Sequence, residues 1–220
     1  MINVALDGPA GSGKSTVARL IAKKLDILYL DTGAMYRACG LKCKRLGLDA
    51  EKEEDVKSFI DGIDLVIRYE NSAQHTFLDG EDVSEEIRKP DVSMLASAVS
   101  AHPCVRVKMV EMQRNIARQT DCVLDGRDIG SYVLPDAKYK FFVTADPKIR
   151  AERRFCELTE KGMKVDFDRL YEEILERDYN DSHRTFAPLV RAEDAVLLDT
   201  SAMTPDEVVD FVLSRITKED

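Results

Sequence analysis

The sequence predicts an α/β fold in which one mostly parallel sheet is covered by helices on both faces. Short apolar runs that are typical of buried strands alternate along the chain with segments whose apolar residues recur at helical spacing. The first strand and the first helix are joined by a glycine-rich loop. Because strand-helix-strand units cross over in the right-handed sense, we expect a three-layer sandwich with ligands at the carboxyl ends of its strands.

Five segments are predicted as core strands, and they are residues 2–6, 27–30, 122–125, 140–144 and 195–198. The helices between them are predicted to include residues 34–47, 49–58, 90–101, 103–119 and 166–182. Two further helix starts carry capping signals. Asp146 stands before Pro147, and Thr204-Pro205-Asp206-Glu207 has the pattern of a capping box.

A small β element interrupts this alternation. Residues 63–69 alternate like a half-buried strand. Thr76-Phe77-Leu78 followed by Asp79-Gly80 predicts an antiparallel partner and a tight turn. We interpret the element as part of an inserted lobe.

The composition indicates one acidic domain. A chain of 220 residues is long enough for one core with small insertions. Its 32 Lys and Arg residues against 41 Asp and Glu residues give a net charge of -9, which argues against nucleic acid or an anionic membrane as the main partner. The chain shows neither an apolar run of 18 residues nor a basic leader, so we expect a cytoplasmic protein. Its five cysteines form no CxxC pair, so we expect reduced thiols.

The most informative segment is the loop Gly8-Pro9-Ala10-Gly11-Ser12-Gly13-Lys14-Ser15, which Thr16 follows. Its glycines let backbone N–H groups converge on phosphate oxygens at the N-terminus of the next helix. Lys14 would reach the β- and γ-phosphates of a nucleoside triphosphate, and Ser15 would place its hydroxyl on Mg²⁺, with Thr16 as a less well placed alternative. The other interpretation, a turn that only joins strand to helix, is far weaker in this context.

Several segments together resemble the bacterial cytidylate kinase family, whose members phosphorylate CMP and dCMP with ATP. The resemblance spans nearly the whole chain and rests on residues 8–16, Asp31-Thr32-Gly33-Ala34-Met35-Tyr36-Arg37, 80–84, 87–88, Asp125-Gly126-Arg127-Asp128-Ile129-Gly130, 134–137, 177–184 and 187–189. The phosphate loop alone is shared by many families, whereas the ordered set is not. The resemblance implies ATP as co-substrate, Mg²⁺ as cofactor and the nucleoside monophosphate kinase fold with strand order 2-3-1-4-5.

The same resemblance implies a single kinase domain with two smaller parts. The core would comprise about residues 1–36, 85–149 and 167–220, with a small β-containing monophosphate-binding lobe at about 37–84 and a short lid at about 150–166. We expect a monomer that binds the small nucleotides ATP, CMP and dCMP, and neither nucleic acid nor a membrane.

An acceptor-phosphate site is implied by three arginines. Arg37, Arg127 and Arg184 match family positions that hold the monophosphate, and a guanidinium fork suits bidentate contact with phosphate oxygens. Thr32 and Tyr36, in the same motif as Arg37, are assigned to CMP by the resemblance as well. The alternative for any one of these arginines is an exposed or salt-bridged side chain, which is less favoured for Arg127 because it directly follows a core strand.

Base selection is implied by the match of Ser97, Arg106 and Asp128 to positions that contact the cytosine edge. A carboxylate and a guanidinium fit a base whose N4 donates hydrogen bonds and whose N3 and O2 accept them. Uracil would present a lone pair to Asp128 and a proton to Arg106, so discrimination against UMP follows. Without the resemblance, the favoured interpretation is two ordinary helix residues and a cap.

The resemblance assigns binding of the sugar hydroxyls to Arg177 and Asp181. Together with Arg184 they have i, i+4 and i+7 spacing, which predicts one helical face. The alternative is a surface ion-pair ladder, which is common in a chain this rich in charge.

Catalysis of phosphoryl transfer chiefly needs positioning and cations. Arg150, Arg153 and Arg154 share one helix at i, i+3 and i+4 and would form a cationic lid, in which we favour Arg150 and Arg154 as the functional pair. The alternative is pairing with neighbouring glutamates, for which Arg153 and Glu157 have the i, i+4 geometry. The catalytic candidates are therefore Lys14, Arg127, Arg150 and Arg154.

Asp125, at the end of the third core strand, is expected to order Mg²⁺ through water, as an acid in that place does in related kinases. A purely structural cap is the alternative.

Two other functions compete with this interpretation. A different small-molecule kinase on the same fold, such as an adenylate or shikimate kinase, would keep the phosphate loop and change the residues that read the base. A nucleotide switch or motor would hydrolyse its nucleotide without an acceptor. The guanine-reading sequence Asn-Lys-x-Asp is absent, and its nearest approximation is residues 217–220.

Overall fold

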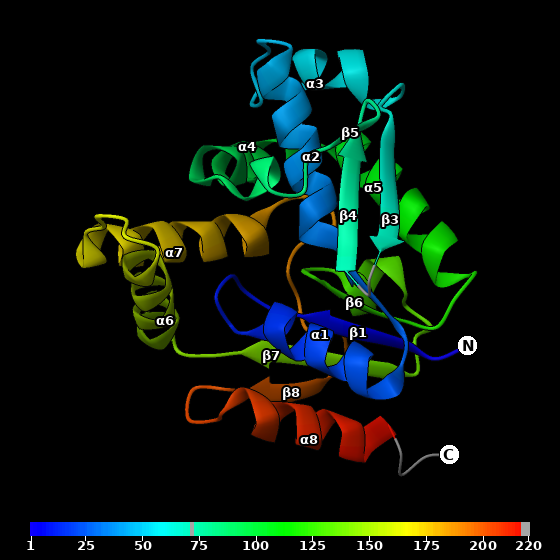
Figure 1. Cartoon of the computed structure of the whole chain (residues 1–220), viewed down its shortest axis with the longest axis vertical. Helices are drawn as coiled ribbons and strands as arrows, with labels where there is room; N and C mark the ends of the chain where they lie inside the picture. The colour runs from blue at the N-terminus through cyan, green and yellow to red at the C-terminus, as the bar shows by residue number, and fades with distance from the viewer. Residues whose placement is uncertain (71–72, 217–220) are drawn as a thin grey trace. The chain divides into compact units, whose positions relative to one another are not determined.

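The computed structural model describes residues 1–70 and 73–216 of the chain (Figure 1). It divides into two compact units: unit 1 comprises Met1–Ile27 with Asp121–Asp220, and unit 2 comprises Leu28–Thr120. Residues 71–72 of the predicted lobe and residues 217–220, with the approximate guanine signature, lie outside the described residues.

Unit 1 is built on a parallel sheet. β1 (Asn3–Asp7) lies between β6 (Cys122–Gly126) and β7 (Tyr139–Thr144), and β8 (Val196–Asp199) pairs with the far side of β7. With β2 (Leu28–Asp31) the strand order is β2-β6-β1-β7-β8, which confirms the predicted order 2-3-1-4-5 of a five-stranded sheet.

The central strand shows why the apolar runs predicted strands correctly. Val4, Ala5 and Leu6 are completely buried, as expected for a parallel strand covered on both faces. Acidic residues stand at the carboxyl ends of two neighbouring strands: Asp7 closes β1, and Asp125 stands opposite Leu6 on β6. The carboxyl edge of this sheet is therefore where chemistry-bearing side chains collect.

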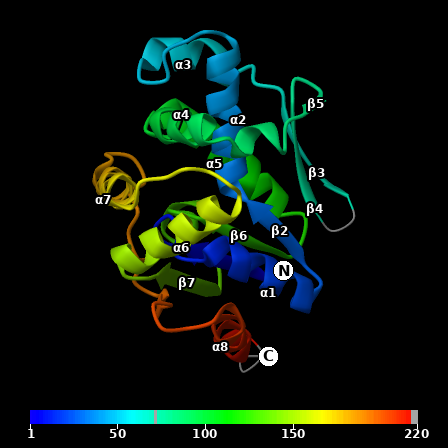
Figure 2. The same cartoon turned by 60° about the vertical axis from the view of Figure 1, so that its left-hand side comes forward.

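The helices of unit 1 are α1 (Lys14–Leu25), α6 (Pro147–Glu160), α7 (Phe167–His183) and α8 (Pro205–Ile216). α1 packs against α8, and α6 packs against α7 (Figures 1 and 2). Both predicted caps are confirmed, because Asp146 accepts the backbone N–H of Lys148 at 2.8 Å and Thr204 exchanges hydrogen bonds with Glu207. One expectation was wrong: α7 ends at His183, so Arg184 is its C-cap in extended conformation and does not continue the helical face.

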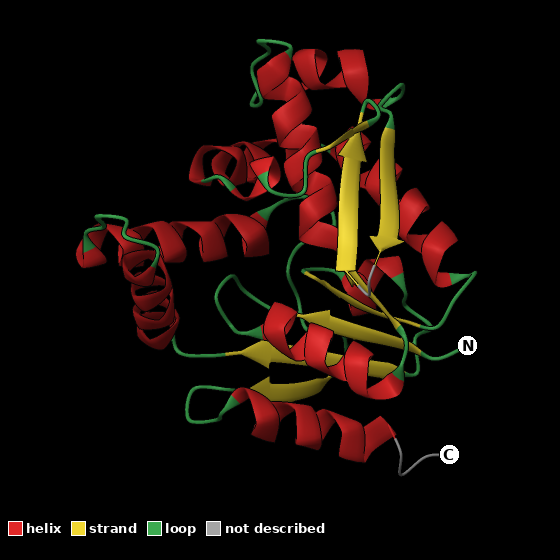
Figure 3. Ribbon diagram, viewed as in Figure 1, coloured by secondary structure: helices red, strands yellow, loops and turns green. Residues whose placement is uncertain are grey.

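Unit 2 combines helices with a small antiparallel sheet (Figure 3). Besides β2, its regular elements are α2 (Thr32–Arg45), α3 (Glu53–Ile60), β3 (Leu65–Glu70), β4 (Ala73–Leu78), β5 (Glu81–Asp82), a 3-10 turn (Glu86–Arg88), α4 (Pro90–Ser100) and α5 (Pro103–Ala117). The predicted tight turn is confirmed, because Asp79 and Gly80 have φ of 52° and 80° and connect β4 to the short strand β5, as a type I′ turn requires.

The helix predicted from Asp49 begins later, at Glu53. The side chain of Asp49 accepts the backbone N–H of Glu51 at 3.0 Å, and the N–H of Asp49 is taken by the carboxylate of Asp55. Short acidic side chains compete in this way for the backbone bonds that a helix would use. Within residues 1–70 and 73–216, no helix has the length and apolar character to cross a bilayer.

Gly40 fixes the closest approach of two helices in unit 2. A Cβ atom at this position of α2 would lie 2.8 Å from the backbone nitrogen of Ala96 and 3.0 Å from the carbonyl carbon of Leu95, both on α4. These are backbone atoms, so they cannot give way by a rotamer change. The two helices therefore need a residue without a side chain at this crossing.

We expect Gly40→Ala to lower the free energy of unfolding by about 2 kcal/mol, because overpacking against backbone outweighs the gain of about 1 kcal/mol in helix propensity. Urea unfolding measures the difference. Gly62→Ala, where a Cβ would meet nothing within 4 Å, is the matched control and should stay within about 0.5 kcal/mol of wild type. Equal midpoints for the two variants would contradict the packing argument.

Candidate active site

The loop between β1 and α1 has a backbone that only glycine allows at two positions. Gly8 has a φ of 150°, and a Cβ there would lie 1.9 Å from the carbonyl oxygen of Val143. Gly13 is left-handed, with a φ of 85°, and caps α1 without a side-chain hydrogen bond, so the first N–H groups of α1 are available to an anion. The other predicted ATP-binding residues form the same loop and the first turn of α1, and they are Pro9, Ala10, Gly11, Ser12, Lys14, Ser15 and Thr16.

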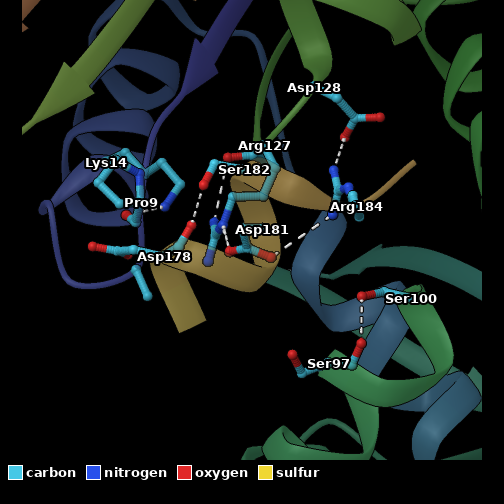
Figure 4. Close-up of polar contacts among 12 residues, drawn as sticks. Pro9, Lys14, Ser97, Ser100, Arg127, Asp128, Asp178, Asp181, Ser182 and Arg184 are labelled. Atoms are coloured by element: carbon cyan, nitrogen blue, oxygen red, sulfur yellow. Dashed lines mark hydrogen bonds and ion pairs between the residues drawn. The ribbon is translucent and has the colours of Figure 1, made fainter. Parts of the chain in front are cut away.

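Lys14 is a buried cation at the start of α1. Its side chain folds back over the loop, and Nζ donates to the carbonyl of Pro9 at 3.0 Å (Figure 4). Burial, together with the nearby positive charges of Arg127 and Arg177, lowers the pKa of Lys14 to about 7, against the opposing effect of Asp125 and Asp181. A bound polyphosphate would place negative charge beside the amino group of Lys14, which would favour its protonated form.

Ser15 and Asp125 meet beside the phosphate loop. The hydroxyl of Ser15 donates to Oδ2 of Asp125 at 2.5 Å, which joins the first turn of α1 to the carboxyl end of β6. Mg²⁺ prefers oxygen ligands and commonly takes one or two from the protein, with water and phosphate oxygens completing its shell. The chemistry of this donor pair therefore fits Mg²⁺.

Arg127 and Asp181 form a mostly buried ion pair in which Nε lies 2.7 Å from Oδ2. Burial by itself would lower the pKa of Arg127, but Asp181 and, more weakly, Asp125 hold it above its ordinary value. Burial would likewise raise the pKa of Asp181, yet Arg127, Arg177 and Arg184 keep it below the ordinary range. The carboxylate thus stays ionised among cations.

Arg184 extends this network to Asp128 (Figure 4). Its guanidinium lies 3.6 Å from Asp128 Oδ1 and 3.8 Å from Asp181 Oδ1, while its Nε donates to the carbonyl of Ala187 at 2.7 Å. The side chains of Arg184 and Asp128 are 8% and 4% exposed. The structure therefore brings Arg127, Asp128, Asp181 and Arg184 together in one connected cluster of unit 1.

Arg150 is fixed at the phosphate loop by a partner that sequence spacing did not reveal. Its side chain is 2% exposed, its Nε donates to Ala145 O, and one terminal nitrogen donates to Ala10 O within the loop, each at 2.9 Å. Asp178 on α7 takes the guanidinium with both carboxylate oxygens. Asp178 stands 28 residues further along the chain, so only the packing of α6 on α7 identifies it.

Arg154 does not join this cluster. It pairs with Glu157 at 2.7 Å, and its side chain is 38% exposed. The proposed i, i+4 pair of Arg153 with Glu157 does not form, because Arg153 donates to the carbonyl of Thr200 at 2.7 Å and Lys161 is the second partner of Glu157. The two arginines favoured for a lid therefore have different environments.

In unit 2, the predicted residues lie on α2, α4 and α5. Arg106 is 1% exposed, lies over the ring of Tyr36 at 5.2 Å from its centroid, and donates to the carbonyl of Ser100 at 3.4 Å. The hydroxyl of Ser100 in turn donates to the carbonyl of Ser97 (Figure 4). A buried guanidinium on an aromatic face, beside the end of α4, has the chemistry that could bind a planar polar ligand.

The motif at the start of α2 is ordered by Asp31. Its carboxylate caps α2 by accepting the N–H of Ala34 at 2.9 Å, and it pairs with Arg37 at 2.8 Å. Thr32 is buried at the first position of the helix. The same carboxylate therefore sets both the helix start and the direction of the Arg37 side chain.

Asp7 is a functional candidate that motif analysis missed. It is the last residue of β1, directly before the phosphate loop, and its carboxylate accepts the backbone N–H groups of Ile129 and Gly130 at 2.7 Å each. The only signal in the sequence was an acidic residue ending an otherwise apolar strand. Its partners lie 122 and 123 residues away, so the contact required the structure.

Comparison with known proteins gives one consistent result. The family model for cytidylate kinase matches residues 4–218. A cytidylate kinase of Caldicellulosiruptor saccharolyticus is 49% identical over 217 residues, which cover 99% of this chain and 96% of that protein. A cytidylate kinase of Clostridioides difficile is 48% identical and covers 97% of each chain. Among solved structures, an uncharacterized protein from Eubacterium ventriosum aligns over 99% of both chains with a TM-score of 0.53 at 15% identity, a likeness of fold alone.

The buried carboxyl group of Asp7 should make the free energy of unfolding depend on pH. Burial raises the pKa of Asp7 to about 7, with the N–H groups of Gly130 and Ile129 opposing, Asp128 adding to the rise and Lys14 opposing it. The folded protein thus keeps this proton up to about pH 7, whereas the unfolded chain loses it near about pH 4. The free energy of unfolding should therefore fall with rising pH in that window, by about 1 kcal/mol per pH unit relative to Asp7→Asn.

Urea unfolding of both proteins at several pH values measures this difference. The two stability curves should run parallel above about pH 7.5, where Asp7 is ionised in both the folded and the unfolded state. Curves that are parallel from about pH 4 upward would contradict the raised pKa.

Proposed function

This chain belongs to the cytidylate kinase family, and we propose that the phosphate loop and the charged cluster of unit 1 carry the family's reaction. The protein is a kinase that transfers the γ-phosphoryl group of ATP to CMP or dCMP, giving ADP and CDP or dCDP. The observation that best supports the residue assignment is the buried Lys14, which lies over the phosphate loop within electrostatic reach of Arg127 and Arg177.

The donor site is the loop of residues 8–16. Its backbone N–H groups and the N-terminus of α1 would hold the phosphates of ATP, and Lys14 would exchange the carbonyl of Pro9 for a phosphate oxygen. Mg²⁺ would be held by the Ser15 hydroxyl, with Asp125 acting through water, and when bound it neutralises charge that develops on the phosphates.

The acceptor phosphate would be bound by Arg37, Arg127 and Arg184. Each of these arginines faces a carboxylate: Asp31 for Arg37, Asp181 for Arg127, and Asp128 with Asp181 for Arg184. A phosphate offers the same fork geometry as a carboxylate, with more charge, so it can replace or share these contacts. Arg177 and Asp181 would then hold the sugar hydroxyls.

Cytosine would be read by Asp128, Arg106 and Ser97. Asp128 is an acceptor-only carboxylate inside unit 1, suited to the N4 amino group, and Arg106 is a buried donor in unit 2, suited to N3 and O2. Uracil reverses the polarity at N3 and at position 4, which would leave both side chains without a matching partner. Thr32 and Tyr36 complete the acceptor set in unit 2.

The two lid candidates would act differently. Arg150 is anchored to backbone carbonyls and to Asp178, so we assign it to a fixed position at the phosphate loop. Arg154 is held only by an exposed pair with Glu157, which costs little to break, so it is the arginine that closure of residues 150–166 would deliver to the transferred group. Closure would also exclude water as a competing acceptor.

Several broader assignments belong to the same proposal. Residues 37–84 would act as the monophosphate-binding lobe, within a single kinase domain of three layers. The protein would work as a cytoplasmic monomer on small nucleotides, without nucleic acid or a membrane as partner.

We expect ADP release in the presence of ATP and Mg²⁺ to depend on CMP or dCMP and to be weak with UMP, AMP, GMP or shikimate. Lys14→Ala should lower kcat by about 10²–10³-fold with the fold retained, because it removes the cation that follows the migrating charge. Lys23→Ala, which removes an exposed lysine of the same helix, is the control and should match wild type. ADP release independent of any acceptor would instead identify a nucleotide hydrolase.

Asp128→Asn should reduce the preference for CMP over UMP by about 10–100-fold, since one well-placed polar contact to a base is worth about 1–3 kcal/mol. Competition kinetics with both acceptors measures the ratio of kcat/KM directly. Asp136→Asn, an exposed acid eight residues further along the chain, is the matched control. An unchanged ratio for Asp128→Asn would remove Asp128 from base recognition.

A further inference from the structure

The carboxylate of Asp7 holds the turn that carries Asp128. One oxygen accepts the N–H of Ile129 and the other accepts the N–H of Gly130, both at 2.7 Å. Asp7 is only 5% exposed, so these two bonds are made inside the protein. Because both N–H groups follow Asp128 directly in the chain, they fix the backbone from which its side chain projects.

The turn itself is short and depends on such outside contacts. Residues Ile129–Val133 form a single π-helical turn, in which the carbonyl of Asp128 accepts the N–H groups of Tyr132 and Val133 at 2.9 Å each. One turn of helix is not stable by itself. The Asp7 carboxylate binds its N-terminal end and holds it against β1.

The side chain of Lys140 also packs closely against the turn. A Cβ at Gly130 would lie 3.1 Å from Cδ of Lys140 and 3.4 Å from Oδ2 of Asp7. The ammonium group of Lys140 donates to the carbonyl of Pro135 and to Asp194 at 2.6 Å. The backbone after Asp128 is therefore in close contact with two buried side chains, those of Asp7 and Lys140.

Burying a carboxylate beside a second buried carboxylate is an expensive way to hold a turn. The pKa of Asp7 is raised by its burial, and Asp128 contributes to that rise. A carboxylate placed at such a cost is typical of a group kept for function, because an apolar or amide side chain would spare the desolvation of a charge.

We infer that Asp7 is a positioning residue for recognition of the acceptor base, and that it acts by holding Asp128 in place next to the phosphate loop. The inference rests on the proposed role of Asp128 in reading cytosine. It gives one residue a link to both substrates, because Asp7 directly precedes Gly8 of the donor site and binds the two residues that follow Asp128.

The test is a double-mutant cycle on the ratio of kcat/KM for CMP and UMP. Asp7→Asn offers only one acceptor oxygen to two N–H groups, so we expect the ratio to fall about tenfold while KM for ATP changes less than about twofold. In Asp128→Asn, adding Asp7→Asn should change the ratio by less than about twofold, because the side chain on which Asp7 acts is already altered. Asp121→Asn is the control, since Asp121 accepts the N–H of Ile2 at the other end of the same sheet.

Gly130→Ala keeps the inference testable if Asp7→Asn does not fold. The added Cβ would crowd the side chain of Lys140 and so displace the same turn, while the Asp7 carboxylate is kept. The ratio of kcat/KM for CMP and UMP should therefore fall as well. Loss of CMP and UMP turnover in equal proportion, in whichever of these variants folds, would mean that Asp7 only stabilises the fold and would overturn the inference. If Asp128→Asn itself leaves the ratio unchanged, the proposed reading of cytosine fails, and the positioning role of Asp7 fails with it.

Discussion

The candidate site depends on a balance between buried cations and the carboxylates that hold them. Arg127 is paired with Asp181, Arg150 with Asp178, and Arg184 lies between Asp128 and Asp181. An unpaired guanidinium at this depth would cost several kcal/mol, so a site this rich in arginine needs acids of its own. The acids also pre-organise the arginines, because a phosphate that takes over a fork-shaped contact finds the guanidinium already desolvated and oriented. An acidic protein with a net charge of -9 can in this way keep several arginines together in one buried cluster.

The bend at the end of α7 is what lets one carboxylate serve two arginines. α7 stops at His183, and the next residues turn back, so that the N–H of Leu189 donates to the carbonyl of Asp181 and Nε of Arg184 donates to Ala187. The i, i+4, i+7 spacing predicted one helical face for Arg177, Asp181 and Arg184, and it was wrong for Arg184, which lies beyond the end of the helix.

The features that the sequence predicted depend on residues close together in the chain, whereas most of those that it missed depend on residues far apart. The strands, the caps at Asp146 and Thr204, and the turn at Asp79-Gly80 depend on neighbouring residues, so patterns of a few residues predicted them to within about two positions. The partners of Asp7 and Arg150 are set by which strands and helices become neighbours, which no local pattern records. The late start of α3 is a local effect of a different kind, in which acidic side chains compete with the backbone for its hydrogen bonds. The family resemblance supplied the acceptor residues as a set, but it could not supply their pairing.

The arginines of the site differ in how firmly protein contacts hold them. Some are fixed by several short bonds, and others have weaker contacts that a ligand could replace. Arg150 donates to two backbone carbonyls and to both oxygens of Asp178, so a phosphate would have to break several short bonds to claim it. Arg184 meets its carboxylates at 3.6 and 3.8 Å, beyond hydrogen-bond distance, so these two ion pairs are looser than that of Arg150 with Asp178. In the proposed function, Arg150 would maintain the shape of the donor loop, while Arg184 would follow the acceptor phosphate. Both roles would use a guanidinium group. The number of protein partners around each guanidinium determines which of the two roles it would take.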